Sequence, residues 1–236
     1  MSHTAGTGTG IRRAQKQKTR QALLDAALLL LEEQSLSSLG LREVTRAVGV
    51  APAAFYRHFR DTADLGVALV DEALGSLHET LRTTLATTGD SGERIAAAIE
   101  LIADLVHGYP AHVRFIVRER HGGVRRVREA IGGQLELFVR EVADELARQP
   151  ESRGWDRDDL LMLAGLYVDH MVMTASAFLA VGPDREARDG ELGERAAQER
   201  AAQERAAQDR GEYERVARTA RRQLRLVALG RRHWLD

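Results

Sequence analysis

The chain has 236 residues, of which 44% are hydrophobic and 29% charged, and its formal net charge is −1 at pH 7. These values describe an ordinary soluble globular protein with a sizeable buried core. The sequence contains no cysteine, which excludes disulfides and thiolate metal sites and fits a cytoplasmic protein. No apolar run is expected to span a membrane.

Charge is distributed unevenly along the sequence. Residues 1–60 carry nine basic and four acidic side chains, a net of +5, which leaves −6 for the remainder. A basic section on an otherwise acidic protein favours a polyanionic partner for that section, although a solvated helix surface has the same composition. The small polar residues of 1–11 predict a disordered tail.

Helical periodicity dominates, and the first part of the chain predicts three helices. Apolar residues within 23–31 repeat on one face of the first helix. A second, short helix over 41–48 is expected to end at Gly49, and Pro52 is placed in the first turn of a third helix, where proline is tolerated. Two helices joined by a turn of about four residues that contains a glycine form a helix-turn-helix.

The third helix has two different faces. Phe55 and Phe59 are four residues apart and are expected to point inward together. The opposite face consists of Pro52, Ala53, Tyr56, Arg57 and Arg60. Small residues let a helix N-terminus approach the floor of a DNA major groove, arginine can reach guanine or phosphate, and a tyrosine hydroxyl suits a phosphate. The alternative is a helical hairpin with a solvated basic face.

The rest of the sequence predicts a larger helical bundle, so the expected fold class is all-α. Asp61 and Asp64 resemble a capping box at the start of a fourth helix. Glycine and proline separate the helices that follow. The expected ranges are 62–86, 91–107, 110–120, 123–148, 157–181 and 212–234.

The segment 160–181 is apolar almost all round, so a helix there is expected to be buried on more than one side. One side would contact the bundle and the other a second copy of the chain. Tyr167 and His170 interrupt the apolar sequence. They either line a ligand pocket or are core polar groups whose hydrogen bonds are satisfied by neighbours.

A five-residue unit, ERAAQ, occurs three times in succession from Glu194. All its residues are strong helix formers, but a five-residue step turns about 140° around a helix, so the alanines form no apolar stripe. The repeat belongs to a low-complexity insertion over 184–211. We expect an exposed helix or a partly disordered segment there, before the last helix.

Residues 15–70 resemble the N-terminal domain of TetR-type transcriptional regulators. The resemblance lies in TRQALLDAALLLLEE (19–33) and LREVTRAVGVAPAAFYRHFRDTADL (41–65). More narrowly, FIVRER (115–120) and RQLRLVALGRRHW (222–234) resemble the repressors of unsaturated-fatty-acid biosynthesis within that family.

The resemblance implies a homodimeric repressor, with a helix-turn-helix DNA-binding domain over 12–62 and a helical ligand-binding and dimerisation domain over 63–236. The dimer is expected to form through the last two long helices, and the operator to be palindromic double-stranded DNA. The effector would be a small apolar molecule such as an acyl thioester of coenzyme A or of acyl carrier protein. No cofactor and no metal are expected.

The residues and the resemblance together predict two sets of contacts. The contacts to DNA are Arg12, Arg13, Lys16, Lys18, Arg20, Arg42, Pro52, Ala53, Tyr56, Arg57, His58, Arg60 and Thr62. The ligand pocket is lined by Leu101, Leu105, Phe115, Ile116, Leu163, Leu166, Tyr167, His170, Met171 and Phe178.

The sequence departs from the family pattern at three places. Gly40 stands where many members have a serine or threonine that caps the second helix, and glycine offers no hydroxyl to a phosphate. Thr62 stands in place of a frequent lysine, and Thr45 in place of a common alanine. The phosphate contacts are therefore expected to be weaker at two points, with the basic residues of 12–20 compensating.

Other functions fit the sequence less well. A related regulator of an efflux or catabolic operon would sense an unrelated apolar molecule, and a helical protein-interaction module would bind no DNA. An enzyme is not expected, because the histidines are scattered, no H-E-x-x-H spacing occurs and there is no glycine-rich phosphate loop.

Overall fold

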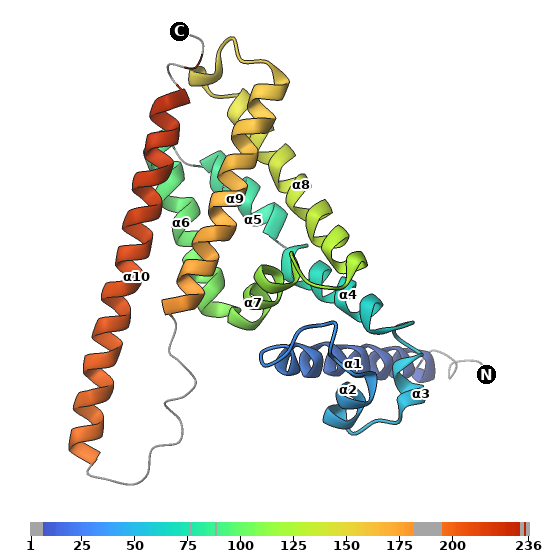
Figure 1. Ribbon diagram of the computed structural model, residues 1–236. Coiled ribbons are helices and arrows are strands. Elements are labelled where there is room, and N and C mark those ends of the chain that lie inside the picture. Colours follow the sequence, from blue (N-terminus) through green and yellow to red (C-terminus); the bar gives the residue numbers. More distant parts are fainter. Residues whose placement is uncertain (1–6, 76, 88, 182–194, 232–233, 235–236) are drawn as a thin grey trace. The chain divides into compact units, whose positions relative to one another are not determined.

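The computed structural model describes residues 7–75, 77–87, 89–181, 195–231 and 234. Within these ranges the regular structure is helical, which confirms the all-α prediction (Figure 1). The elements are α1 (Thr7–Leu30), α2 (Leu41–Val48), α3 (Pro52–Phe55), α4 (Thr62–Leu74), α5 (Leu77–Thr87), α6 (Ser91–Gly108), α7 (Pro110–Glu119), α8 (Arg125–Ala147), the 3-10 helix η1 (Pro150–Ser152), α9 (Arg157–Val181) and α10 (Arg195–Arg231).

The chain divides into two compact units. The first consists of Met1–Ser76 with Arg114–Gln134, and the second of Leu77–Val113 with Leu135–Asp236. Helices α7 and α8 therefore each contribute residues to both units. The segment around the α7–α8 connection, which the sequence places in the ligand-binding domain, groups with the N-terminal helices instead.

The first unit is built around α1, which packs against α2 and α4. Its buried apolar side chains include Leu23, Leu24, Ala27, Leu31, Leu36, Val44, Phe55, Phe59, Leu65, Leu69, Val70, Val127 and Ile131. Gly66 allows a close approach within this core, because a Cβ atom there would lie 2.5 Å from Leu36 Cδ2 and 2.7 Å from Val127 Cγ2. The start of α8 is thus packed directly on α4.

The second unit has two apolar clusters. One joins α6, α9 and α10 around Phe178 and Leu224, and the other joins α8 and α9 around Leu146 and Leu163. Tyr167 packs against both clusters, and burial raises the pKa of its phenol. Helix α9 is therefore buried on two sides, as its composition predicts.

Helix α10 lies antiparallel to α9 and is continuous from Arg195 to Arg231 (Figure 1). The expected separate last helix over 212–234 is therefore wrong, because the ERAAQ units from Arg195 onward belong to the same helix. Strong helix formers extend the helix, and Gly211 within it costs only about 1 kcal/mol relative to alanine. The rest of the predicted insertion, 184–194, lies outside the described residues.

Two further helix boundaries differ from expectation. Helix α1 begins at Thr7, so 7–11 are helical and not a tail, because each added turn extends an existing helix at little cost. Residues 1–6 lie outside the described part. The fourth helix expected over 62–86 is instead α4 and α5, separated after Gly75, where glycine lowers helix propensity.

Helix α9 is long and apolar enough to cross a membrane by length and composition alone. We expected no membrane-spanning segment because no uninterrupted apolar run in the sequence is long enough. Six of its side chains are nonetheless buried in the two clusters or beside them. Core helices of soluble proteins pass the same test, so this feature is weak support for membrane contact.

Candidate nucleic-acid interface

The turn between α2 and α3 has the predicted glycine in the left-handed conformation. Gly49 has φ 73° and ψ 30°. Its N–H donates to the carbonyl of Arg46 at 3.1 Å, and the N–H of Val50 donates to the carbonyl of Thr45 at 3.0 Å. This pair of bonds is a Schellman motif, which satisfies the last carbonyls of α2 and turns the chain sharply into α3.

The segment Pro52–Arg60, here called the recognition segment, begins as α3 and continues as tight turns. The α-helix itself ends at Phe55, earlier than the sequence suggests. Hydrogen bonds from the N–H groups of His58 (2.8 Å) and Phe59 (3.0 Å) to the Phe55 carbonyl maintain a helical turn. The predicted faces therefore survive although the regular helix is short.

Phe55 and Phe59 anchor the recognition segment from the inside. Their side chains are 0% and 3% exposed, and their ring centroids lie 5.5 Å apart. The guanidinium of Arg20, on α1, lies 5.2 Å from the centre of the Phe59 ring, so α1 holds this end of the segment by a cation–π contact. The inward orientation of both phenylalanines is confirmed.

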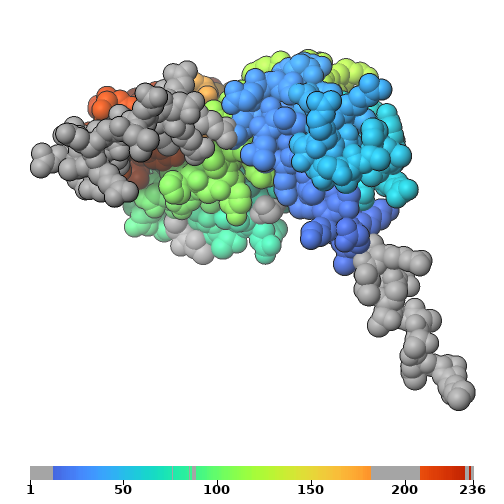
Figure 2. All heavy atoms as spheres, turned by 90° about the horizontal axis from the view of Figure 1, so that it is seen from below, coloured from blue at the N-terminus to red at the C-terminus, as the bar shows by residue number. Residues whose placement is uncertain are grey.

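The opposite face of the recognition segment is open to solvent. Tyr56 is 63% exposed. Pro52, Ala53, Arg57 and Arg60 are also exposed. Figure 2 shows the atoms of the N-terminal helices, blue to cyan, as one continuous surface. The nine residues of the recognition segment thus have a buried face with two aromatic rings and an exposed face with small and basic side chains.

Basic side chains act on His58 from two elements. Burial and the positive charges of Lys16, Arg20 and Arg57 hold the pKa of His58 below its usual value. Its Nδ1 atom is buried without a hydrogen-bond partner among the described residues. Basic side chains from α1 and from the recognition segment therefore act on the same place, as a polyanion-binding surface requires.

The other predicted DNA contacts lie on three helices. Arg13, Lys16 and Lys18 are exposed on α1, Arg42 is exposed on α2, and Thr62 is half-buried at the start of α4. The side chain of Arg12 lies outside the described part of the structure.

The N-terminus of α2 compensates for the missing cap side chain at Gly40. The Glu43 carboxylate accepts the Gly40 N–H at 3.3 Å and is itself contacted by the Gln34 amide at 3.3 Å. Thr45 is buried, and its hydroxyl donates to the Arg42 carbonyl at 3.3 Å. The two departures from the family pattern are therefore accommodated locally, but neither supplies a hydroxyl to a phosphate.

Charged residues far away in the sequence hold the first unit together, and sequence reasoning missed this role. Arg118 donates to the carbonyls of Leu31 (2.7 Å) and Gln34 (2.9 Å), which closes the end of α1. The carboxylate of Glu119, 1% exposed, accepts the Leu36 N–H at 2.9 Å. The basic character of FIVRER was visible, but its partners more than eighty residues earlier were not.

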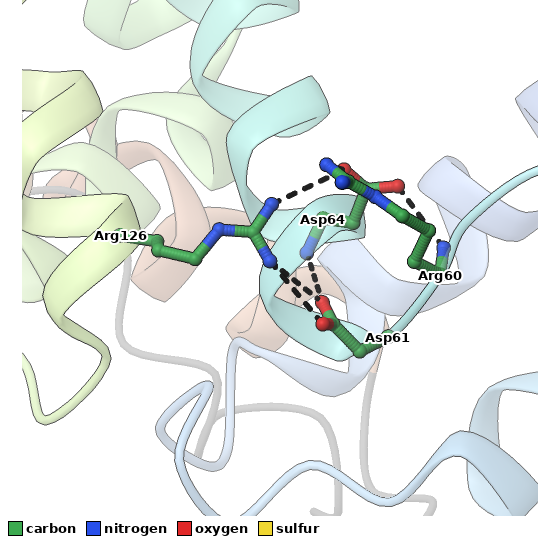
Figure 3. Close-up of polar contacts among 4 residues, drawn as sticks. All are labelled: Arg60, Asp61, Asp64 and Arg126. Carbon is green, nitrogen blue, oxygen red and sulfur yellow. Dashed lines mark hydrogen bonds and ion pairs between the residues drawn. The ribbon is translucent and has the colours of Figure 1, made fainter.

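A second such contact lies at the start of α4. Asp61 caps the helix by accepting the Asp64 N–H, as predicted, at 2.6 Å. Asp64 does not return this bond to Asp61, as a capping box would require; its carboxylate accepts the Arg60 N–H at 3.0 Å instead. Arg126 on α8 contacts both aspartates (Figure 3).

The residues predicted to line a ligand pocket are divided between the two units. Phe115 and Ile116 are buried in the first unit. The other eight belong to the second unit: Leu101, Leu105, Leu163, Leu166, Tyr167, His170, Met171 and Phe178. Tyr167, Met171 and Phe178 share one cluster, whereas Leu166 is 55% exposed and points away from the interior.

His170 is a polar residue of the predicted pocket, in the second unit. Its Nε2 atom is buried and has no hydrogen-bond partner within the part of the chain that the structure describes. Its carbonyl accepts the hydroxyl of Thr174 at 2.8 Å.

The sequence over residues 23–69 matches the family model of bacterial regulatory proteins, tetR family. This range contains the core of α1, all of α2, the turn at Gly49, the recognition segment and most of α4.

Solved structures with low sequence identity share the fold. The transcriptional regulator FadR from Bacillus subtilis, in complex with stearoyl-CoA, is 15% identical, with a TM-score of 0.58, over 84% of this chain and 97% of that one. AibR in complex with isovaleryl coenzyme A and operator DNA is 14% identical, with a TM-score of 0.55, over 84% and 95%. The SmeT–triclosan complex is 17% identical, with a TM-score of 0.57, over 73% and 84%.

The family match and the shared fold cover the two parts of the chain in different ways. The match in sequence is confined to the N-terminal helices, where the helix-turn-helix geometry is seen directly. The likeness in fold extends over most of the chain. This all-helical protein therefore has a DNA-binding domain of the tetR family type, followed by a larger helical domain.

Proposed function

We propose that this protein is a dimeric transcriptional repressor that acts in the cytoplasm, binds a two-fold-symmetric operator and releases it when a small apolar effector occupies the larger helical domain. The observation that carries the DNA-binding part is the exposed basic face of Pro52–Arg60, held from behind by buried Phe55 and Phe59. In a dimer, two such segments would enter successive major grooves about 34–36 Å apart.

An apolar row on α9 supports dimerisation through α9 and α10. Met162, Leu166 and Met173 are 47%, 55% and 66% exposed, and their spacing of four and seven residues places them on one helix face. Leu226 and Leu229 are exposed on α10. Large apolar side chains that recur on exposed faces favour a protein interface, and a second copy of the same two helices would cover them.

The effector we propose is a long-chain acyl thioester. Two of the regulators with a similar fold were solved with coenzyme A thioesters. In this chain α6 and α9 supply half-buried apolar side chains, including Leu101, Leu105 and Met171, that could border a bound chain. Each buried CH₂ group contributes about 0.8 kcal/mol, so affinity should rise steeply with chain length. Control of fatty-acid biosynthesis is the finer form of this proposal.

A second candidate is a regulator that senses an unrelated apolar compound, as in an efflux or catabolic operon. The SmeT complex with triclosan has a similar fold at comparable identity, so the fold is compatible with either class of ligand. A protein-interaction module that binds no DNA is disfavoured by the family match over the helix-turn-helix.

The experiment has two stages. Double-stranded DNA fragments are first selected from a random library by the full-length protein, and a palindromic, salt-sensitive binding site is expected. Acyl-CoAs of increasing length, free coenzyme A and triclosan are then titrated against the protein–DNA complex. Release that strengthens with chain length supports the acyl thioester, whereas release by triclosan alone supports the second candidate. Failure to enrich any DNA would contradict the regulator proposal itself.

A further inference from the structure

Four charged side chains meet where the recognition segment joins α4 (Figure 3). The Nη1 atom of Arg126 lies 3.3 and 3.2 Å from the two carboxylate oxygens of Asp61, and its Nη2 atom lies 3.4 Å from Asp64 Oδ1. Asp64 also accepts the Arg60 guanidinium at 3.0 Å and the Arg60 N–H at 3.0 Å. All four residues belong to the first compact unit.

The two aspartates lie beside the segment that we propose contacts DNA. Asp61 directly follows Arg60, the last residue of the exposed recognition segment, and Asp64 lies four residues after Arg60. Hydrogen bonds from Arg60 hold the pKa of Asp64 below its usual value, so this carboxylate is ionised at neutral pH. With Arg60 alone, two carboxylates would leave a local net charge of −1, which repels phosphate; the guanidinium of Arg126 brings the cluster to zero.

The ion pair between Arg126 and Asp61 is expected to contribute little to the stability of the fold. The side chains of Arg126 and Asp61 are 40% and 54% exposed. Ion pairs at such exposure typically contribute about 0–1 kcal/mol, because water and salt screen them. The α4 N-cap is made by Asp61 itself and does not depend on the arginine. A role in the electrostatics of the DNA-facing surface is therefore separable from a role in folding.

We infer that Arg126, at the start of α8 and more than sixty residues beyond the helix-turn-helix, is a charge-balancing residue of the DNA-binding surface: it neutralises Asp61 and Asp64 so that phosphate can approach Arg60 and the recognition segment. The inference rests on the proposed DNA-binding function. Arg126 acts through the two aspartates and is a positioning residue, with no DNA contact of its own required.

The test compares DNA affinities of full-length variants for a fragment selected by the wild-type protein, measured by fluorescence anisotropy at about 0.1 M salt. Arg126→Ala should weaken binding about fivefold, because it leaves one uncompensated negative charge near the phosphates. Arg125→Ala is the matched control: this neighbouring arginine is exposed, pairs with Glu129 at 3.5 Å and carries the same charge. Its loss should change affinity less than about twofold.

Charge compensation gives a readout that a purely structural role would not. Adding Asp61→Asn to Arg126→Ala should return the affinity to within about twofold of wild type, because asparagine still caps α4 but carries no charge. The gap between Arg126→Ala and wild type should also narrow as salt is raised. Equal affinities of Arg126→Ala and Arg125→Ala, or failure of Asp61→Asn to restore binding, would overturn the inference.

Two further outcomes, a variant that does not fold and a wild-type protein that binds no DNA, are distinguished from failure of the inference. If Arg126→Ala fails to fold by circular dichroism, Asp61→Asn in the wild-type background replaces it. This variant should bind DNA about threefold more tightly, since a negative charge is removed while Arg126 stays, and unchanged or weaker binding would contradict the charge-balancing role. A wild-type protein that enriches no DNA overturns the proposed function and this inference with it.

Discussion

At the scale of single residues, the recognition segment combines two buried rings with an exposed polar face. Phe55 and Phe59 fix its position, while the side chains of Tyr56 and Arg57 are exposed on the other side. Substitutions on the exposed face should therefore change DNA binding without unfolding the protein.

The first prediction concerns that face. Arg57→Ala should weaken operator binding by roughly 1–3 kcal/mol and relax sequence preference at one position if the arginine reads a base. Tyr56→Phe should weaken binding to all sequences alike, because only a phosphate contact is lost. Affinities for a panel of operator variants check this, with Arg153→Ala, an exposed arginine of the second unit, as control. Wild-type affinity in both variants would show that another face meets DNA.

His58 gives a prediction about stability and pH. Burial and nearby cations lower its folded-state pKa below the ordinary value of 6.5. A histidine shifted in this direction contributes stability that is fully present above about pH 6.5 and is lost as pH falls towards the folded pKa, because the unfolded chain binds the proton more readily.

The measurement is thermal unfolding between neutral pH and about pH 5.5. The melting temperature of wild type should fall more on acidification than that of His58→Gln, in which this titration is absent. All other residues are the same in the two proteins, so the difference between their pH profiles isolates His58. Parallel pH profiles for the two proteins would mean that the surrounding cations do not act on this side chain.

At the scale of elements, the two glycines Gly49 and Gly132 show how backbone conformation decides the effect of the same substitution. Gly49 ends α2 at φ 73°, a conformation that costs alanine roughly 1–2 kcal/mol. Gly132 lies within α8, and a Cβ atom there would meet no other atom within 4 Å.

We therefore expect Gly49→Ala to lower the free energy of unfolding by roughly 1–2 kcal/mol and to disturb the turn that presents the recognition segment. Gly132→Ala should raise it by roughly 0.5–1 kcal/mol, because alanine is the better helix former. Chemical denaturation followed by circular dichroism measures both. The two substitutions should change the free energy of unfolding in opposite directions. A stabilising Gly49→Ala would be incompatible with a left-handed residue at this turn.

The helical elements and the helix-turn-helix could be predicted from the sequence because their causes are local. Gly49 and Pro52 mark the turn, and Phe55 and Phe59 reveal the buried face by their spacing. The continuous α10 was missed because a five-residue repeat has no apolar stripe, although each of its residues favours a helix.

The contacts that complete the first unit could not be predicted in this way. Glu119 reaches Leu36 across 83 positions, and Arg126 reaches Asp61 across 65. Such pairs depend on how α7 and α8 pack, which the pattern of one segment does not determine. Apolar periodicity identifies the buried face of a helix but not the helix that it contacts. The residues predicted to line the pocket therefore came from both units.

At the scale of the whole molecule, the exposed row on α9 gives the next prediction. Leu166→Glu with Met173→Glu should convert a dimer into a folded monomer, because two charges would be buried without partners in the proposed interface. Light scattering after gel filtration measures the mass. Operator affinity should fall at the same time, since one copy reads only half of a palindrome.

The matched control is Leu137→Glu, which places one charge on an apolar side chain of α8 that is 43% exposed. It should leave the mass of the assembly unchanged. A double variant that remains dimeric would exclude this face of α9 from the interface, and a wild-type monomer would reject the dimer altogether.

The ERAAQ repeat at the start of α10 determines how the length of this helix would change if units were added or removed. Each unit adds five residues, or about 7.5 Å of helix. Among the side chains of α10 that the structure describes, those packed against the core begin at Tyr213, after the last unit. A change in copy number would therefore alter the length of the helix before its packed part and leave the packed residues in register with their neighbours. The length of α10 before its packed part can therefore change in steps of five residues without any change in the packing of the core.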